Sequence, residues 1–176
     1  MVFPPSLWSA VFLLSMIFGT VCAEQPTEYQ VKGAYLYNFT KFITWPSTAF
    51  TDDQAPFRLC VLGDNPFGSA LEALTKKTTQ NHPITILYLE AVQQAAQCHL
   101  LFITQAESEK ISAILTTIQK KPILTVGDRA DFARQGGMIH FVNISDNLKF
   151  AINLETVLQA GLKVNATLLQ VGHVIP

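Results

Sequence analysis

Few residues of this 176-residue chain have the type and spacing that catalysis requires. No Gly-x-Ser-x-Gly elbow is present to expose a nucleophilic serine. Neither Cys60 nor Cys98 stands in a charged setting that would activate a thiolate. The four histidines are scattered, and no two have the spacing of metal ligands on one helix: His82, His99, His140 and His173. We therefore predict no catalytic residue, no metal site, no cofactor and no enzymatic activity.

One glycine-bearing loop, residues 63–68, lies where nucleotide-binding folds keep a phosphate site, between a predicted strand and a predicted helix. A phosphate-binding loop presents successive backbone N–H groups, often beside a lysine. Here Pro66 removes one donor and Asp64 places a negative charge at the mouth. We expect a structural loop with Asn65 as the helix N-cap, and no binding of ATP or GTP. A small-ligand site in this loop is the alternative.

Three carboxylates follow predicted strands and could gather at the C-terminal edge of a sheet, where open α/β folds bind ligands. They are Asp64, Asp128 and Asp131. In a ligand-binding protein, Asp64, Asn65 and Asp128 would be the contact residues. Carboxylates at these positions are also ordinary helix N-caps, which is the interpretation we prefer.

The elements that would position these residues alternate between strand and helix. Continuous apolar runs predict strands that are covered on both faces, at residues 56–62, 84–89, 100–104 and 123–126. Helical patterns lie before and between them, at residues 28–43, 66–76, 91–97 and 107–120. This alternation predicts an α/β fold with a mostly parallel sheet flanked by helices, flavodoxin-like or Rossmann-like.

The C-terminal part of the chain has a different pattern. Residues 137–142 and 148–152 predict two strands joined by a tight polar turn, hence an antiparallel hairpin. Helices are expected at residues 154–160 and 166–171, with Gly161 just past the end of the first.

The N-terminus predicts export. Residues 1–23 carry no charged side chain, and the apolar run from 7 to 21 is shorter than the roughly 20 residues that span a bilayer. Val21 and Ala23 are small residues at the −3 and −1 positions for cleavage before Glu24. We expect residues 1–23 to be a cleaved signal peptide and residues 24–176 to form one domain outside the cytoplasm, in an oxidising compartment. An uncleaved anchor, or a lipoprotein through Cys22, is the alternative.

Charge and cysteine count narrow the function further. The formal net charge is −1 and no basic block is present, which excludes nucleic acid as an expected partner. Removal of the signal leaves Cys60 and Cys98, and an even number of cysteines in an exported chain indicates a disulfide. Two buried free thiols would be the alternative.

Four ordered stretches resemble the YfiR family of bacterial periplasmic proteins. They are VKGAYLYNFTKFITWP (31–46), CVLGDNPFG (60–68), PILTVGDRADFARQGGMIHF (122–141) and INLETVLQAGLKVNATLL (152–169). The resemblance implies a non-enzymatic repressor that binds the periplasmic portion of an inner-membrane diguanylate cyclase and lowers cyclic di-GMP signalling, hence biofilm formation. It also implies an OmpA-like outer-membrane lipoprotein as a second partner.

The resemblance places Cys60 and Cys98 where the family has a structural disulfide. The second cysteine pair of some family members is absent, because no cysteine follows residue 98. In addition, Ala151 stands where the family's Arg-Phe-Glu pattern has an acidic residue.

The segment from Leu154 to the C-terminus is apolar on more than one helical face, which exceeds the single stripe that covers a sheet. Some of this surplus should be exposed and serve association. We expect Glu155, Leu158 and Leu162 to form part of a surface for the cyclase or for a homodimer. The alternative is that the segment wraps a corner of the domain and buries both faces. Other functions that the sequence leaves open are a periplasmic small-ligand sensor and an extracytoplasmic hydrolase.

Overall fold

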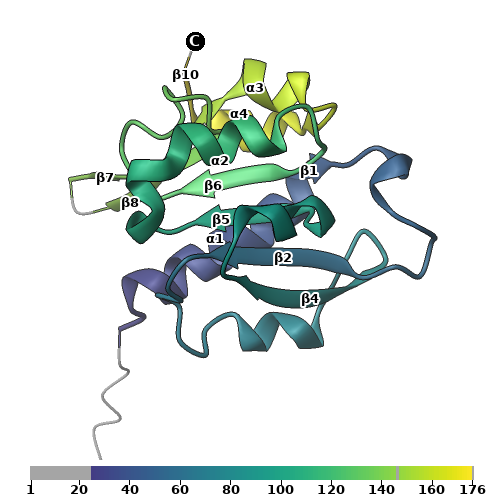
Figure 1. Cartoon of the computed structure of the whole chain (residues 1–176). Helices are drawn as coiled ribbons and strands as arrows, with labels where there is room; N and C mark the ends of the chain where they lie inside the picture. Colours follow the sequence, from purple (N-terminus) through teal and green to yellow (C-terminus); the bar gives the residue numbers. More distant parts are fainter. Residues whose placement is uncertain (1–24, 146, 176) are drawn as a thin grey trace, which may run out of the picture.

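The computed structural model describes residues 25–145 and 147–175 (Figure 1). The expected signal peptide, with its cleavage site before Glu24, lies outside these residues. Within the described ranges, no helix is both long enough and apolar enough to cross a membrane.

An eight-stranded sheet forms the centre of the fold, in the order β10-β8-β7-β6-β5-β2-β4-β3. Five neighbouring strands are parallel: β4 (His82–Leu89), β2 (Phe57–Leu62), β5 (Leu100–Ile103), β6 (Leu124–Gly127) and β7 (Ile139–Ile144). Numbered along the chain, these five have the order 2-1-3-4-5 of flavodoxin-like sheets. This confirms the predicted α/β fold with a mostly parallel sheet.

The remaining strands lie at the edges. β8 (Asn147–Asn153) pairs antiparallel with β7, which confirms the predicted C-terminal hairpin. β10 (His173–Ile175) pairs parallel with β8, and β3 (Thr78–Thr79) pairs antiparallel with β4. A separate two-stranded ribbon joins β1 (Ile43–Thr44) to β9 (Lys163–Val164). The sequence did not predict β10, because three residues are too few to show a strand period.

Helices cover both faces of the sheet, with α1 (Glu28–Phe42) on one side and α2 (Ile111–Ile118) on the other (Figure 1). Successive side chains of β2 point to opposite faces of the sheet, so the core consists of two clusters, one on each face. Leu59 and Val61 face the larger cluster with Leu36 and Phe39 of α1, while Cys60 faces the smaller cluster under α2. Helix α1 begins with a capping box, in which Thr27 and Gln30 exchange backbone and side-chain hydrogen bonds.

Several connections are tighter than the predicted α-helices. η2 (Glu72–Lys76) and η3 (Val92–Gln97) are 3₁₀ helices, and η4 (Gln105–Lys110) replaces the first part of the helix expected at 107–120. Gly68 and Lys120 have left-handed backbones, with φ of 54° and 60°, so the helical path is interrupted at the first and ended at the second. Another 3₁₀ turn, η1 (Ser47–Ala49), follows β1. α3 (Leu154–Gln159) and α4 (Ala166–Val171) form where helices were predicted.

Candidate functional site

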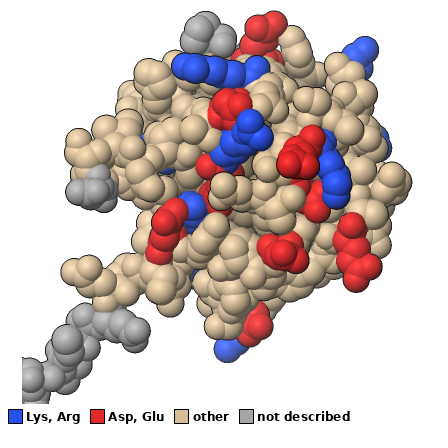
Figure 2. Space-filling model, turned by 60° about the vertical axis from the view of Figure 1, so that its left-hand side comes forward, with Lys and Arg blue, Asp and Glu red and all other residues tan. Residues whose placement is uncertain are grey.

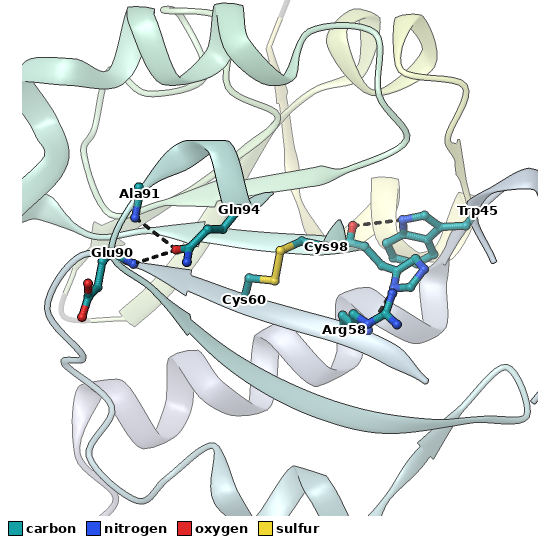
Figure 3. Close-up of a disulfide and its surroundings, with 8 residues drawn as sticks. Trp45, Arg58, Cys60, Glu90, Ala91, Gln94 and Cys98 are labelled. Atoms are coloured by element: carbon teal, nitrogen blue, oxygen red, sulfur yellow. Dashed lines mark hydrogen bonds between the residues drawn. A yellow bond between two sulfur atoms is a disulfide. The ribbon is translucent and has the colours of Figure 1, made fainter. Parts of the chain in front are cut away.

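A disulfide joins Cys60 of β2 to Cys98, two residues before β5 begins (Figure 3). The two Cα atoms are 6.0 Å apart, and both residues are buried in the cluster beneath α2. Because β2 and β5 are neighbours, Cys60 lies close to the segment that leads into β5, which contains Cys98. Closing a loop of 38 residues stabilises the fold by roughly 4 kcal/mol on the chain-entropy model. The predicted pairing is confirmed.

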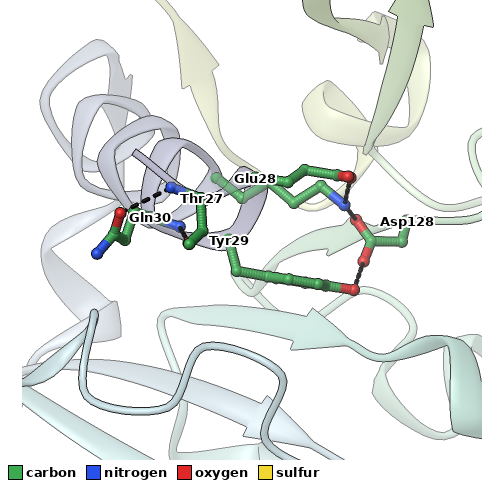
Figure 4. A network of polar contacts seen from close by, with 6 residues as sticks. Thr27, Glu28, Tyr29, Gln30 and Asp128 are labelled. Atoms are coloured by element: carbon green, nitrogen blue, oxygen red, sulfur yellow. Dashed lines mark hydrogen bonds and ion pairs between the residues drawn. The ribbon is translucent and has the colours of Figure 1, made fainter. Parts of the chain in front are cut away.

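The C-terminal end of β6 carries a buried ion network (Figure 4). Asp128 follows the strand directly, and its Oδ1 lies 2.8 Å from Nζ of Lys32, which is only 4% exposed. The Tyr29 hydroxyl donates to Asp128 Oδ2 at 2.9 Å, and Glu28 Oε1 lies 2.6 Å from the same ammonium. Tyr29 and Lys32 at the start of α1 therefore converge on the Asp128 carboxylate, and Glu28 pairs with the same lysine.

The network changes the acidity of Tyr29. Burial, and then the hydrogen bond to the Asp128 carboxylate, raises the pKa of Tyr29 to about 12, because both disfavour the phenolate. Both carboxylate oxygens of Asp128 are thus engaged by side chains of the protein, Oδ1 by Lys32 and Oδ2 by Tyr29. As a ligand contact, Asp128 stays a prediction, and one that would require this network to open.

The other two predicted ligand contacts lie in the loop after β2 and make none of the bonds of that network. Asp64 is exposed. Asn65 is occupied locally, since its Oδ1 accepts from the Phe67 N–H at 3.0 Å and its amide donates to the Gly68 carbonyl. The expected capping contact of Asn65 is present, but it opens a series of turns in place of an α-helix.

Packing accounts for the glycine that starts this loop. Gly63 has φ of 93°, and a Cβ there would overlap the Thr104 hydroxyl at the end of β5 and crowd Cγ of Glu107. Thr104 and Glu107 therefore pack against the Gly63 backbone near the ends of β2 and β5, where flavodoxin-like folds bind ligands. Figure 2, which turns this side of the molecule forward, shows Lys and Arg side chains intermixed with Asp and Glu.

The opposite ends of the strands are closed by neutral groups. His99, between the disulfide and β5, accepts at Nδ1 from the Arg58 backbone N–H at 2.9 Å, and its Nε2 lies 3.0 Å from the Ala49 carbonyl. The His99 carbonyl in turn accepts from the Trp45 indole N–H (Figure 3). Since Nδ1 must accept, the proton of a neutral ring is on Nε2 and is donated to Ala49.

An aromatic stack completes this closure. Phe50 lies between two imidazoles, with ring centroids 3.9 Å from His82 and 4.4 Å from His99. His82 Nδ1 also contacts the Ala55 carbonyl at 2.7 Å. Burial lowers the pKa of His99, because the imidazolium would lose hydration and the Nδ1 acceptor. Segment 45–56 is thus fastened across the starts of the strands.

The predicted partner surface is only partly exposed. Leu158 on α3 is 55% exposed, and Glu155 beside it is exposed and accepts a hydrogen bond from Gln159. Leu162 differs from the expectation: it is 1% exposed and belongs to the main core. Because the chain turns at Gly161, with φ of 74°, Leu162 packs inward and is not a surface residue.

Both interpretations of the C-terminal segment hold in part. Val157, Leu162 and Leu168 are buried, as expected for a segment that wraps a corner. Val171 and Val174 join Leu158 among the exposed large hydrophobic residues. Some apolar side chains of this segment are therefore exposed, as expected, but they are Leu158, Val171 and Val174, and Leu162 is not among them.

Two arrangements escaped the sequence interpretation, namely the network at Asp128 and the stack at Phe50. A signal for the first was present, since Lys32 lies among the apolar positions of α1. In the described ranges, no group of three or more His, Cys, Asp and Glu side chains is placed to hold a metal ion.

Comparison with known proteins gives one family match. The family model described as YfiR/HmsC-like matches residues 29–173, from the first turn of α1 to the start of β10. A search of curated proteins finds no match.

Proposed function

This chain belongs to the YfiR/HmsC-like family, and from that membership we propose that it is a non-enzymatic periplasmic regulator of a diguanylate cyclase. In this proposal the protein represses the enzyme by binding the periplasmic portion of the inner-membrane cyclase, which lowers cyclic di-GMP. Residues 1–23 are then a signal peptide removed before Glu24, and residues 24–176 form the working domain. The buried disulfide between Cys60 and Cys98 supports this location, because such bonds persist in oxidising compartments.

The observation that carries the proposal is the exposed apolar surface near the C-terminus. Within the described residues, three of the five exposed large hydrophobic side chains lie between positions 158 and 174: Leu158, Val171 and Val174. They belong to α3, α4 and β10, and contiguous exposed apolar patches mark association sites. We place Leu158 and the neighbouring Glu155 in the contact with the cyclase.

The structure offers a matched pair for testing this surface. Leu158 is 55% exposed and Ile144, at the end of β7, is 54% exposed. Aspartate at either position introduces the same charge at the same exposure, but only Leu158 lies in the proposed contact. Leu162 is unsuitable, because a charge at this buried position would test folding and not binding.

Binding of the purified protein to the periplasmic portion of the cyclase should separate the two variants. We expect Leu158→Asp to weaken binding more than tenfold, because an interface leucine contributes about 1.5 to 3 kcal/mol. Ile144→Asp should bind within about twofold of the parent. Cells that carry Leu158→Asp should have raised cyclic di-GMP. If Leu158→Asp binds normally while its melting temperature is unchanged, the contact with the cyclase lies elsewhere.

A further inference from the structure

A cavity of about 550 Å³ opens between α2, α3 and the starts of β6 and β7. Its volume lies within the roughly 300 to 1,000 Å³ that small-molecule sites occupy. Apolar side chains form much of its lining: Leu115, Ile118, Ile123, Met138 and Ala160. This cavity is separate from the buried network at Asp128 and from the loop after β2, the two places where the sequence suggested a ligand.

The charged residues that line the cavity are all basic. Lys120 and Lys121 line it, and no Asp or Glu does. Neither lysine takes part in an ion pair within the described ranges. The remaining polar lining comes from uncharged hydroxyl and amide side chains: Ser112, Thr116, Gln119, Thr125, Gln135, Thr156 and Gln159.

Two of these amides keep nearby carboxylates occupied. Gln135 donates to Asp131 at 2.6 Å, and Gln159 donates to Glu155 at 2.9 Å. Neither carboxylate lines the cavity. A bound anion would therefore meet the two ammonium groups, and the lining would place no carboxylate against it.

The turn after α2 holds the first of these lysines in a costly conformation. Lys120 has φ of 60°, in the left-handed region that residues other than glycine seldom adopt. The Lys121 N–H donates to the Ile118 carbonyl at 3.2 Å, which closes the turn at the end of the helix. The turn keeps both lysines among the lining residues, beside Ile118 and Ile123.

We propose that this cavity binds a small amphiphilic organic anion, an apolar chain or ring that carries one carboxylate. The apolar body packs on Leu115, Ile118 and Met138, and the carboxylate lies between the Lys120 and Lys121 ammonium groups. A cationic amphiphile would face the like charge of the two lysines, and a neutral one would gain burial without the ion pairs. The proposal does not depend on the regulatory function above.

Three probes of equal chain length isolate the charge preference: octanoate, 1-octanol and octylammonium. Titration of the mature protein, followed by backbone amide chemical shifts, should give the affinity order octanoate, then octanol, then octylammonium. The largest shifts should fall on residues 112–125, 135–138 and 156–160. Equal affinities for the three probes, or shifts centred outside these ranges, would refute the proposal.

A matched pair of lysines supplies the control. Lys120→Gln with Lys121→Gln should weaken octanoate about five- to tenfold and leave octanol unchanged, because only the carboxylate loses its partners. Lys76→Gln with Lys77→Gln removes the same charge at the end of η2, away from the cavity lining, and should leave octanoate affinity unchanged. If both double variants lose the same octanoate affinity, the loss reflects the net charge of the protein, and the proposed site is wrong.

Thr156→Trp tests the cavity independently of charge. Thr156 is half-buried in the lining, so a bulky ring there should fill the space and reduce the binding of octanoate and octanol together. A folded Thr156→Trp variant that binds both probes as the parent does would place binding outside the cavity. If this variant does not fold, the lysine pairs decide, because both pairs lie at exposed or half-buried positions.

Discussion

The two ends of the parallel strands are closed by opposite kinds of chemistry. At the C-terminal ends, α1 supplies Lys32 and Tyr29 to the buried carboxylate of Asp128. At the N-terminal ends, His99 holds segment 45–56 through neutral hydrogen bonds and the stack on Phe50. The first closure requires charged partners and the second requires an uncharged ring.

This difference predicts where each closure is vulnerable. A buried ion pair is costly to break on one side only, because the surviving charge has neither water nor partner. A buried neutral imidazole fails when acid protonates it, because Nδ1 then presents a proton to the Arg58 N–H. The C-terminal closure should therefore be sensitive to substitution, and the N-terminal closure to acid.

Substitution of the buried lysine should give the largest effect. Lys32→Met keeps much of the chain's bulk but leaves Asp128 buried without its cation. We expect a loss of about 3 to 5 kcal/mol in the free energy of unfolding, measured by urea denaturation. Adding Asp128→Asn should restore part of the loss, because it removes the unpaired charge.

Lys41 provides the control on the same helix, since it is exposed and in the last turn of α1. Lys41→Met should change the unfolding free energy by less than about 1 kcal/mol. Equal losses at Lys32 and Lys41 would mean that the network at Asp128 does not stabilise the closure.

Removal of the tyrosine hydroxyl should give a smaller effect. Tyr29→Phe keeps the edge contact with Phe67, whose ring centroid lies 5.3 Å away, and removes only the bond to Asp128. A hydrogen bond to a charged acceptor is worth about 1.5 to 3 kcal/mol. Tyr35→Phe loses a bond to the neutral Leu148 carbonyl and should cost less, about 1 kcal/mol. A larger loss of unfolding free energy in Tyr35→Phe than in Tyr29→Phe, measured by urea denaturation, would show that the charge of Asp128 does not strengthen its hydrogen bond.

Acid should produce the smallest change in unfolding free energy, and it should act on the closure at the N-terminal ends of the strands. Because the pKa of folded His99 lies below its ordinary value of 6.5, the unfolded chain takes up the proton first as the pH falls. The contribution of His99 is complete above about pH 6.5 and is lost progressively below it, toward the pKa of the folded state. His140 adds to the same trend, since burial lowers its pKa as well.

His99→Asn should flatten this acid dependence. The asparagine oxygen can accept from the Arg58 N–H in place of Nδ1, but it does not titrate. The unfolding free energy, measured between about pH 8 and about pH 5, should therefore fall less for the variant than for the parent. His173→Asn, at an exposed position in β10, serves as the control; since the charge of His173 is only a minor cause of the lowered pKa of His140, its slope should change less than that of His99→Asn. An unchanged slope in His99→Asn would assign the acid sensitivity to other groups.

The helices and strands that the sequence predicted correctly are those with a clear pattern among residues close in the chain. The helical pattern at residues 28–43 predicted α1 to within one residue of its end. Continuous apolar runs predicted β2 and β5 as buried parallel strands, and their adjacency accounts for the bond between Cys60 and Cys98. These features follow from residues close in sequence or from the order of strands.

Local sequence patterns could not predict contacts between residues that are far apart in the chain. Tyr29 and Asp128 are 99 positions apart, and His99 and Ala49 are 50 apart, so no local spacing relates them. Leu158 and Leu162 look alike in the sequence, since both are leucines on one helical face. Only the turn at Gly161 decides that one is exposed and the other is core.

By itself, the sequence determined the fold class, the disulfide and the family, because apolar periodicity, cysteine positions and motif order survive without knowledge of side-chain contacts. The tertiary structure decided which polar groups meet. It engaged Asp128 with Lys32, placed His99 against Phe50 and left Lys120 and Lys121 beside an apolar cavity. The physical reason is that buried charge and hydrogen bonding depend on distances of a few ångströms between segments, which folding alone brings together.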